Sequence, residues 1–173
     1  MDSSSTLIGV AIAIPAPWAA ELEQWRASFG DPQATAIPAH ITLLPPTRVS
    51  AEELKDVELH LAEVATGSRE FDIHLRGTAT FRPVSPVVFI ALSIGISGCE
   101  SLEQSVRTGM LERDLDYPYH PHVTVAHDLP DEVLDHAYES LSDFSARFTV
   151  DAFSLYVHSD SGVWQVRRTF SFG

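Results

Sequence analysis

Two short segments of the chain carry the same pattern of histidine and threonine, His40-Ile-Thr42-Leu and His122-Val-Thr124-Val. Imidazole has a pKa of about 6.5, so it can accept or donate a proton near neutral pH. A threonine hydroxyl can donate a hydrogen bond to an anionic oxygen. Two such segments together could therefore remove one proton and deliver another while holding an anion between them.

Both segments have the alternating pattern of a half-buried β-strand. Residues i and i+2 of a strand point to the same face, so His40 projects together with Thr42, and His122 with Thr124. The apolar residues between them are expected to face the core. Two prolines follow the first segment and are expected to close its strand.

The rest of the sequence predicts elements that repeat in the same order. The first half begins with a predicted strand at 6–14, followed by a helix with Trp18, Leu22, Trp25 and Phe29 on one face. The strand of the first motif comes next. A helix capped by Ser50 and Glu53 and a strand at 71–81 complete this half. The second half begins with a predicted strand at 86–93, followed by a helix with Leu102, Val106 and Met110 on one face. The strand of the second motif and a helix that begins at Pro130 come next. We expect a strand at 147–157 and a last strand at 163–170 that pairs with the strand at 147–157.

Matching elements lie about 80 residues apart, which indicates an internal repeat. We therefore expect one domain, residues 1–173, made of two pseudo-symmetric lobes at about 6–82 and 86–170, each with the order β-α-β-α-β. An approximate two-fold axis between such lobes would let the two His/Thr pairs face each other across a cleft.

This arrangement would suit cleavage of a phosphodiester. One imidazole would take a proton from the attacking oxygen, and the other would give a proton to the leaving oxygen. The hydroxyls of Thr42 and Thr124 would donate to the non-bridging phosphate oxygens, where charge develops in the transition state. This chemistry requires no metal, and we expect no cofactor.

At the segments His40-Ile-Thr42-Leu-Leu-Pro-Pro and His120-Pro-His122-Val-Thr124-Val the sequence resembles the 2H phosphoesterase superfamily, and within it the LigT-like bacterial 2′-5′ RNA ligase family. The resemblance implies a bilobal α+β fold whose antiparallel sheets line a central cleft. It also implies that His40 and His122 are the acid–base pair and that Thr42 and Thr124 bind the phosphate. Many relatives follow the first motif with an aromatic residue and a glycine, whereas leucine and two prolines stand here.

The sequence therefore predicts a metal-independent phosphodiesterase that acts on nucleoside 2′,3′-cyclic phosphates or related small 2′-linked phosphodiesters. Two alternatives remain open at this point. The cleft could belong to a module that binds a nucleotide without turning it over, or the chain could be an RNA 2′-5′ ligase. The motifs do not say which histidine is the acid and which is the base.

Four further residues are candidates for substrate binding. Tyr119 and Phe81 could stack on a base, although each could equally pack within the fold. His120 precedes His122 by two residues and could lie at the mouth of the cleft or at the surface. Arg82 could contact a phosphate.

The composition limits the partners. The net charge is −13, from 11 basic and 24 acidic residues, so we expect no extended nucleic-acid surface and a substrate that is a small nucleotide or an RNA terminus. A metal site made by His40, His120 and His122 is not predicted, because no acidic residue nearby would support it. The apolar run at 7–20 is too short to span a bilayer and follows no basic segment, so we expect a cytoplasmic monomer that does not bind membranes.

Overall fold

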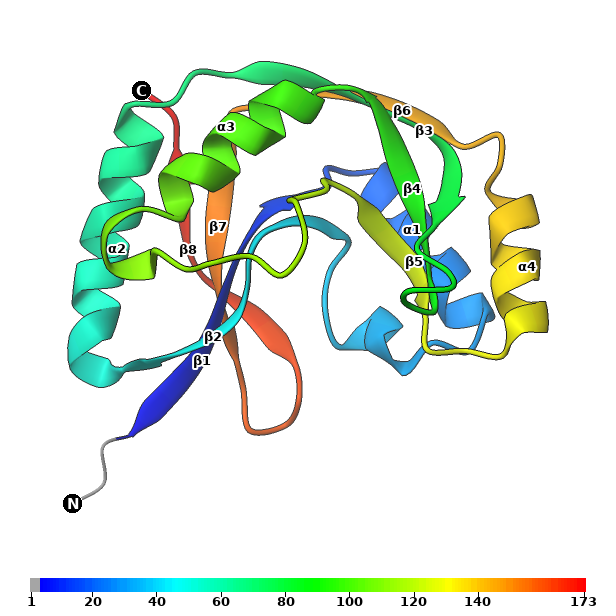
Figure 1. Ribbon diagram of the computed structural model, residues 1–173, viewed down its shortest axis with the longest axis horizontal. Coiled ribbons are helices and arrows are strands. Elements are labelled where there is room, and N and C mark those ends of the chain that lie inside the picture. The colour runs from blue at the N-terminus through cyan, green and yellow to red at the C-terminus, as the bar shows by residue number, and fades with distance from the viewer. Residues whose placement is uncertain (1–3) are drawn as a thin grey trace.

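The computed structural model describes residues 4–173, and its strands form two four-stranded antiparallel sheets (Figure 1). The first sheet, sheet A, contains in order β2 (His40–Ser50), β1 (Ser5–Ala13), β7 (Ala152–His158) and β8 (Trp164–Ser171). The second sheet, sheet B, contains β5 (Val123–His127), β4 (Val87–Ile94), β3 (Phe71–Thr80) and β6 (Ser145–Val150). The predicted α+β architecture with antiparallel sheets is therefore confirmed.

Each sheet takes strands from both halves of the sequence. The strand β1 pairs with β2 on one side and with β7 on the other, while β4 lies between β5 and β3. The lobes expected at about 6–82 and 86–170 therefore do not coincide with the two sheets. The halves instead exchange strands: the first half gives β3 to sheet B, and the second half gives β7 and β8 to sheet A.

In residues 4–173, four α-helices cover these sheets, and some of them pack against strands from the other half of the sequence (Figure 1). They are α1 (Trp18–Ser28), α2 (Ala51–Thr66), α3 (Ile96–Val106) and α4 (Asp131–Ser140), with short 3₁₀ helices η1 (Pro32–Thr35) and η2 (Gly109–Leu111). The helix α1 packs against β5 of sheet B, whereas α3 packs against β2 of sheet A. Both strands that carry a His/Thr motif are thus supported from behind by a helix. None of the helices in residues 4–173 has the length and apolar character needed to cross a membrane.

The first motif strand is longer than predicted. It runs through Pro45 and Pro46 to Ser50, where the predicted capping box begins α2: the Ser50 hydroxyl accepts from the Glu53 amide at 3.1 Å. The prolines are tolerated because β2 is an edge strand, and both lie opposite the single residue Gly9 in a bulge.

Two further expectations were wrong. The strand predicted at 147–157 is two strands, β6 and β7, which separate at Asp151 and belong to different sheets. Met110 does not share the buried face of α3, because that helix ends at Val106 and the Met110 side chain is 42% exposed.

Candidate active site

The first motif begins at the edge of sheet A, where His40 is the first residue of β2. The His40 Nδ1 atom lies 2.8 Å from the carbonyl oxygen of Pro38. A carbonyl oxygen can only accept a hydrogen bond, so Nδ1 carries the proton and Nε2 of the neutral ring keeps a free lone pair. The backbone before His40 is fixed as well: the amide of Ala39 donates to the Glu23 carboxylate of α1 at 3.0 Å.

The second motif has the same local geometry. His122 directly precedes β5, and its Nδ1 atom lies 2.7 Å from the carbonyl oxygen of His120. In both motifs the histidine therefore donates to the carbonyl two residues earlier, and Nε2 is the nitrogen left for chemistry. Thr124 follows within β5, as Thr42 follows within β2.

The two motif strands contact each other, although they are edge strands of different sheets. The two histidines are close enough for the charge of His122 to affect the pKa of His40. Burial lowers the pKa of His40 from 6.5 to about 4, against the hydrogen bond to Pro38, and the positive charges of Arg26 and His122 lower it further. Burial also lowers the pKa of His122. Both imidazoles are therefore neutral at pH 7 in the free protein.

On the sheet A side, His40 and Thr42 line a pocket of about 130 Å³ together with Tyr156 and Trp164. Burial raises the pKa of Tyr156, so its hydroxyl stays protonated and can donate a hydrogen bond. Gly9 forms part of the lining, and the absence of a side chain there leaves room beside the Trp164 ring. The sequence analysis missed Tyr156 and Trp164, because no local motif connects them with residues more than 100 positions earlier.

On the sheet B side, His122 lies among aromatic rings. Its ring centroid is 5.0 Å from that of Phe81 and 5.1 Å from that of Phe89, both at steep angles. His120 contacts the same two rings and is exposed. The structure thus places the candidates Phe81 and His120 beside His122, and it adds Phe89, whose strand is otherwise an ordinary buried one.

The other two candidate residues have different surroundings. The Tyr119 hydroxyl donates to the carbonyl oxygen of Thr42 at 2.7 Å and the ring packs against the core, so this residue links the two motifs. This position agrees with the packing role rather than with stacking on a base. The Arg82 guanidinium is 2.9 Å from the carboxylate of Asp135 in α4, so its charge is already paired with protein. This geometry does not favour the predicted phosphate contact of Arg82.

Neither a metal cluster nor a reactive thiol is found in residues 4–173. In this range no three or more His, Cys, Asp or Glu side chains are grouped so that they could hold a metal ion, and His40, His120 and His122 form no such group. Cys99 is buried, and burial raises the pKa of its thiol to about 12.

The chain matches the family model of the 2′-5′ RNA ligase superfamily over residues 14–162. The chain belongs to this superfamily. It is 31% identical over 145 residues to a Bacillus licheniformis protein named as a phosphoesterase, covering 83% of this chain and 85% of the relative. It is 31% identical over 152 residues to a similarly named protein of Halalkalibacterium halodurans, covering 83% and 84% of the two chains. The resemblance to 2H phosphoesterases is thereby confirmed, and these relatives support a phosphoesterase activity.

Two solved structures share the fold. E. coli LigT in complex with NADP⁺ superposes with a TM-score of 0.72 at 23% identity, over 98% of this chain and 99% of LigT. The protein TT0787 of Thermus thermophilus gives a TM-score of 0.69 at 23% identity, over 96% and 97% of the two chains. The LigT-like arrangement of the two sheets is therefore confirmed.

Proposed function

We propose that this protein is a phosphodiesterase that opens nucleoside 2′,3′-cyclic phosphates, or related small 2′-linked phosphodiesters, by paired-histidine catalysis that needs no metal. One observation carries the proposal. His40 and His122 are held by the same hydrogen bond to a carbonyl two residues earlier, so each leaves Nε2 free. Each is followed two residues later by a threonine, on one of two strands that contact each other.

The reaction would use one imidazole as base and the other as acid. The base accepts a proton at Nε2 from a water molecule that attacks the phosphorus, and the protonated partner gives its proton to the ribose oxygen that leaves. The ring opens to a nucleoside monophosphate. The hydroxyls of Thr42 and Thr124 donate to the non-bridging oxygens as negative charge builds on them.

The surroundings support a nucleotide as the ligand. Tyr156 and Trp164 offer an aromatic wall next to His40, and Phe81 and Phe89 offer another next to His122. Aromatic side chains of this kind can stack on a base or pack against a ribose. Structures of E. coli LigT hold small nucleotides, among them 3′-AMP, ATP and NADP⁺. A small nucleotide is therefore the ligand class that we propose for this chain.

The test is a product-resolved screen of 2′,3′-cyclic nucleotides, ADP-ribose cyclic phosphate and 2′-5′ dinucleotides. We expect His40→Ala and His122→Ala each to lower turnover by about 100-fold or more, with an unchanged circular dichroism spectrum. His127→Ala is the matched control, because its exposed imidazole lies at the far end of β5. EDTA should leave the wild-type rate unchanged.

Four outcomes would contradict the proposal. Turnover that survives in both histidine variants would remove the acid–base pair, and turnover lost in EDTA would indicate a metal. Tight calorimetric binding of cyclic nucleotides without product would favour the binding module instead. Joining of RNA ends, seen on gels in the absence of hydrolysis, would favour the ligase.

A further inference from the structure

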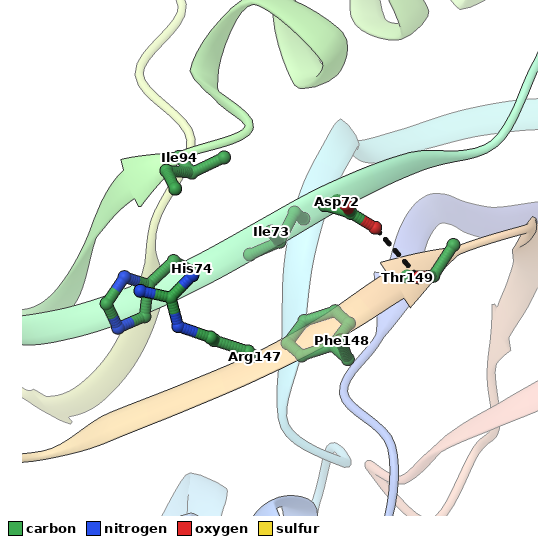
Figure 2. Close-up of a pocket in the computed structure, with 7 residues that line it drawn as sticks. All are labelled: Asp72, Ile73, His74, Ile94, Arg147, Phe148 and Thr149. Carbon is green, nitrogen blue, oxygen red and sulfur yellow. Dashed lines mark hydrogen bonds between the residues drawn. The ribbon is translucent and has the colours of Figure 1, made fainter.

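Another pocket lies on sheet B, away from the two motifs. It has a volume of about 310 Å³, and β3 and β6 provide most of its lining. Figure 2 shows the His74 and Arg147 side chains next to each other on these neighbouring strands, as expected from their direct pairing in the sheet. Asp72 and Thr149 form the adjacent pair, and their side chains are hydrogen-bonded at 2.8 Å.

The pocket carries arginine charge that the protein does not neutralise. Arg147 lines it, and Arg76 lies on the same strand as His74, two residues further along. Both arginines are exposed, and within residues 4–173 neither forms an ion pair nor donates a side-chain hydrogen bond. Asp72 is the one acidic residue of the lining. Because neither guanidinium is held by a protein partner in residues 4–173, both are available to bind an anion, in a chain whose net charge is −13.

His74 holds hydroxyl groups in place beside these charges. Its ring is buried between two serines, with Nδ1 2.9 Å from the Ser93 hydroxyl and Nε2 2.9 Å from the Ser145 hydroxyl. Burial and the charges of Arg147 and Arg76 lower the pKa of His74, so the ring stays neutral and positions the serines. Unpaired guanidinium groups together with fixed hydroxyls are the donors that proteins use to bind phosphate.

The pocket lies on the same face of sheet B as the second motif. Alternate residues of β4 share a face, so Phe89, Ala91 and Ser93 project together. Phe89 pairs with Thr124 and contacts His122, whereas Ser93 contacts His74. The four residue steps from Phe89 to Ser93 span about 13 Å of strand. The side chain between them is the small Ala91, so no large residue of β4 separates the two places.

We propose that the pocket lined by His74, Arg147 and Thr149, with Ser93 and Ser145 hydrogen-bonded to His74, binds an upstream phosphate of an oligonucleotide whose terminal phosphodiester lies between His40 and His122. This inference rests on the proposed function and names a further subsite for it. Phe89 beside His122 and Ser93 beside His74 lie about 13 Å apart along β4, so the group that meets Arg147 would be an upstream phosphate and not the reacting one. The pocket would therefore add a contact for an RNA terminus that a free cyclic nucleotide does not make.

The kinetic test compares 2′,3′-cyclic AMP with a tetranucleotide that ends in a 2′,3′-cyclic phosphate. We expect Arg147→Gln to lower kcat/KM for the tetranucleotide about fivefold, mainly through KM, and to leave kcat/KM for cyclic AMP unchanged. Lys55→Gln is the control, because it removes one exposed positive charge from α2 on the other sheet. Equal effects of Arg147→Gln on both substrates, or an effect of Lys55→Gln as large as that of Arg147→Gln, would overturn the subsite.

A binding test separates this subsite from the catalytic proposal. A fluorescent deoxytetranucleotide with a 3′-phosphate cannot be cyclised, so its affinity reports binding alone. Arg147→Gln should weaken its binding about fivefold and reduce the dependence of affinity on salt, while 3′-dAMP should bind both proteins equally. If cyclic substrates are not hydrolysed but this difference is found, the subsite stands and the proposed reaction fails. If binding of the tetranucleotide is unchanged in Arg147→Gln, the subsite is wrong.

Discussion

At the scale of single residues, the two candidate histidines are held alike although their positions in the sheets differ. His40 is the first residue of β2, and His122 precedes β5, yet each gives its Nδ1 proton to the carbonyl two residues earlier. Both rings are neutral in the free protein because burial lowers both pKa values. A bound phosphodiester carries negative charge, which raises the pKa of a nearby imidazole. Substrate binding would therefore favour the singly protonated pair that acid–base catalysis requires.

These pKa shifts predict an acidic optimum for kcat/KM. The active free enzyme needs one neutral and one protonated imidazole, and the remaining proton should lie on His122, because the pKa of His40 is lowered to about 4. The rate should rise as His40 loses its proton near pH 4 and fall as His122 loses its own, below its ordinary pKa of 6.5. Initial rates with a cyclic nucleotide between about pH 3 and pH 9 measure this profile. A maximum at or above pH 7 would contradict the lowered pKa values of the two histidines.

The residues of the candidate site differ in how far the sequence could reveal them. His40, Thr42, His122 and Thr124 stand out because a short local pattern occurs twice at matching places in a repeat. Tyr156 reaches the same pocket only because β7 pairs with β1, which brings together residues almost 150 positions apart. No local pattern encodes such a pairing. Tyr119 was recognised as a candidate, but its role as a link depends on the position of the Thr42 carbonyl, which only the fold determines.

At the scale of elements, the segment between α3 and β5 leads into the second motif and is hydrogen-bonded to β2, the strand of the first motif. It leaves α3 at Val106 and passes over the edge of sheet A before it reaches His122. The Tyr119 hydroxyl donates to Thr42, and the Arg113 side chain donates to the Thr47 hydroxyl at 3.4 Å. Two contacts thus join this segment to β2. The hydrogen bond of Tyr119 is the shorter of the two, so we expect it to contribute more to holding Thr42 in place relative to the second motif.

Removal of the Tyr119 hydroxyl should loosen this connection. Tyr119→Phe keeps the ring but leaves the Thr42 carbonyl without its donor, which costs about 1 kcal/mol of unfolding free energy and lowers Tm by about 2–4 °C. We also expect kcat/KM to fall several-fold, because Thr42 is then held less firmly opposite Thr124. Differential scanning calorimetry and initial rates are the measurements. Tyr138→Phe is the control, since that side chain is 39% exposed, and an equal Tm for wild type and Tyr119→Phe would show that the bond is dispensable.

The elements themselves were largely predictable, but their assignment to sheets was not. The positions of β1, β2, β3 and β4 follow from alternation and apolar runs, and the start of α2 follows from the capping box of Ser50 and Glu53. The single strand expected at 147–157 failed because alternation continues through Asp151 while the chain passes from sheet B to sheet A. Periodicity reports which face of a strand is buried, and it carries no information on the partner strand.

At the scale of the whole molecule, the two halves of the sequence are interlocked. The strand β3 of the first half pairs only with β4 and β6 of the second half, and β1 separates β2 from β7. Within the first half alone, the sheet pairing left is the two-stranded pair β1–β2. Within the second half, β6 has no partner strand, and the pairs β4–β5 and β7–β8 remain. Isolated two-stranded pairs are at most marginally stable in water.

Because each sheet needs strands from both halves, we predict that neither half folds alone and that the two halves fold together. A division between Val84 and Ser85 falls in the connection between β3 and β4, where Val84 is 71% exposed, so it breaks no strand. Fragments 1–84 and 85–173 should each give the circular dichroism spectrum of a largely unfolded chain. Co-expressed, they should form a one-to-one complex with the spectrum of the intact protein, because each supplies the strands that complete the other's sheet. The complex should also hydrolyse the substrate of the intact chain, since each fragment brings one His/Thr pair to the site.

A fragment that folds by itself with a cooperative thermal transition would contradict this prediction. It would show that the lobes are independent units and that the exchanged strands do not hold the two motifs together.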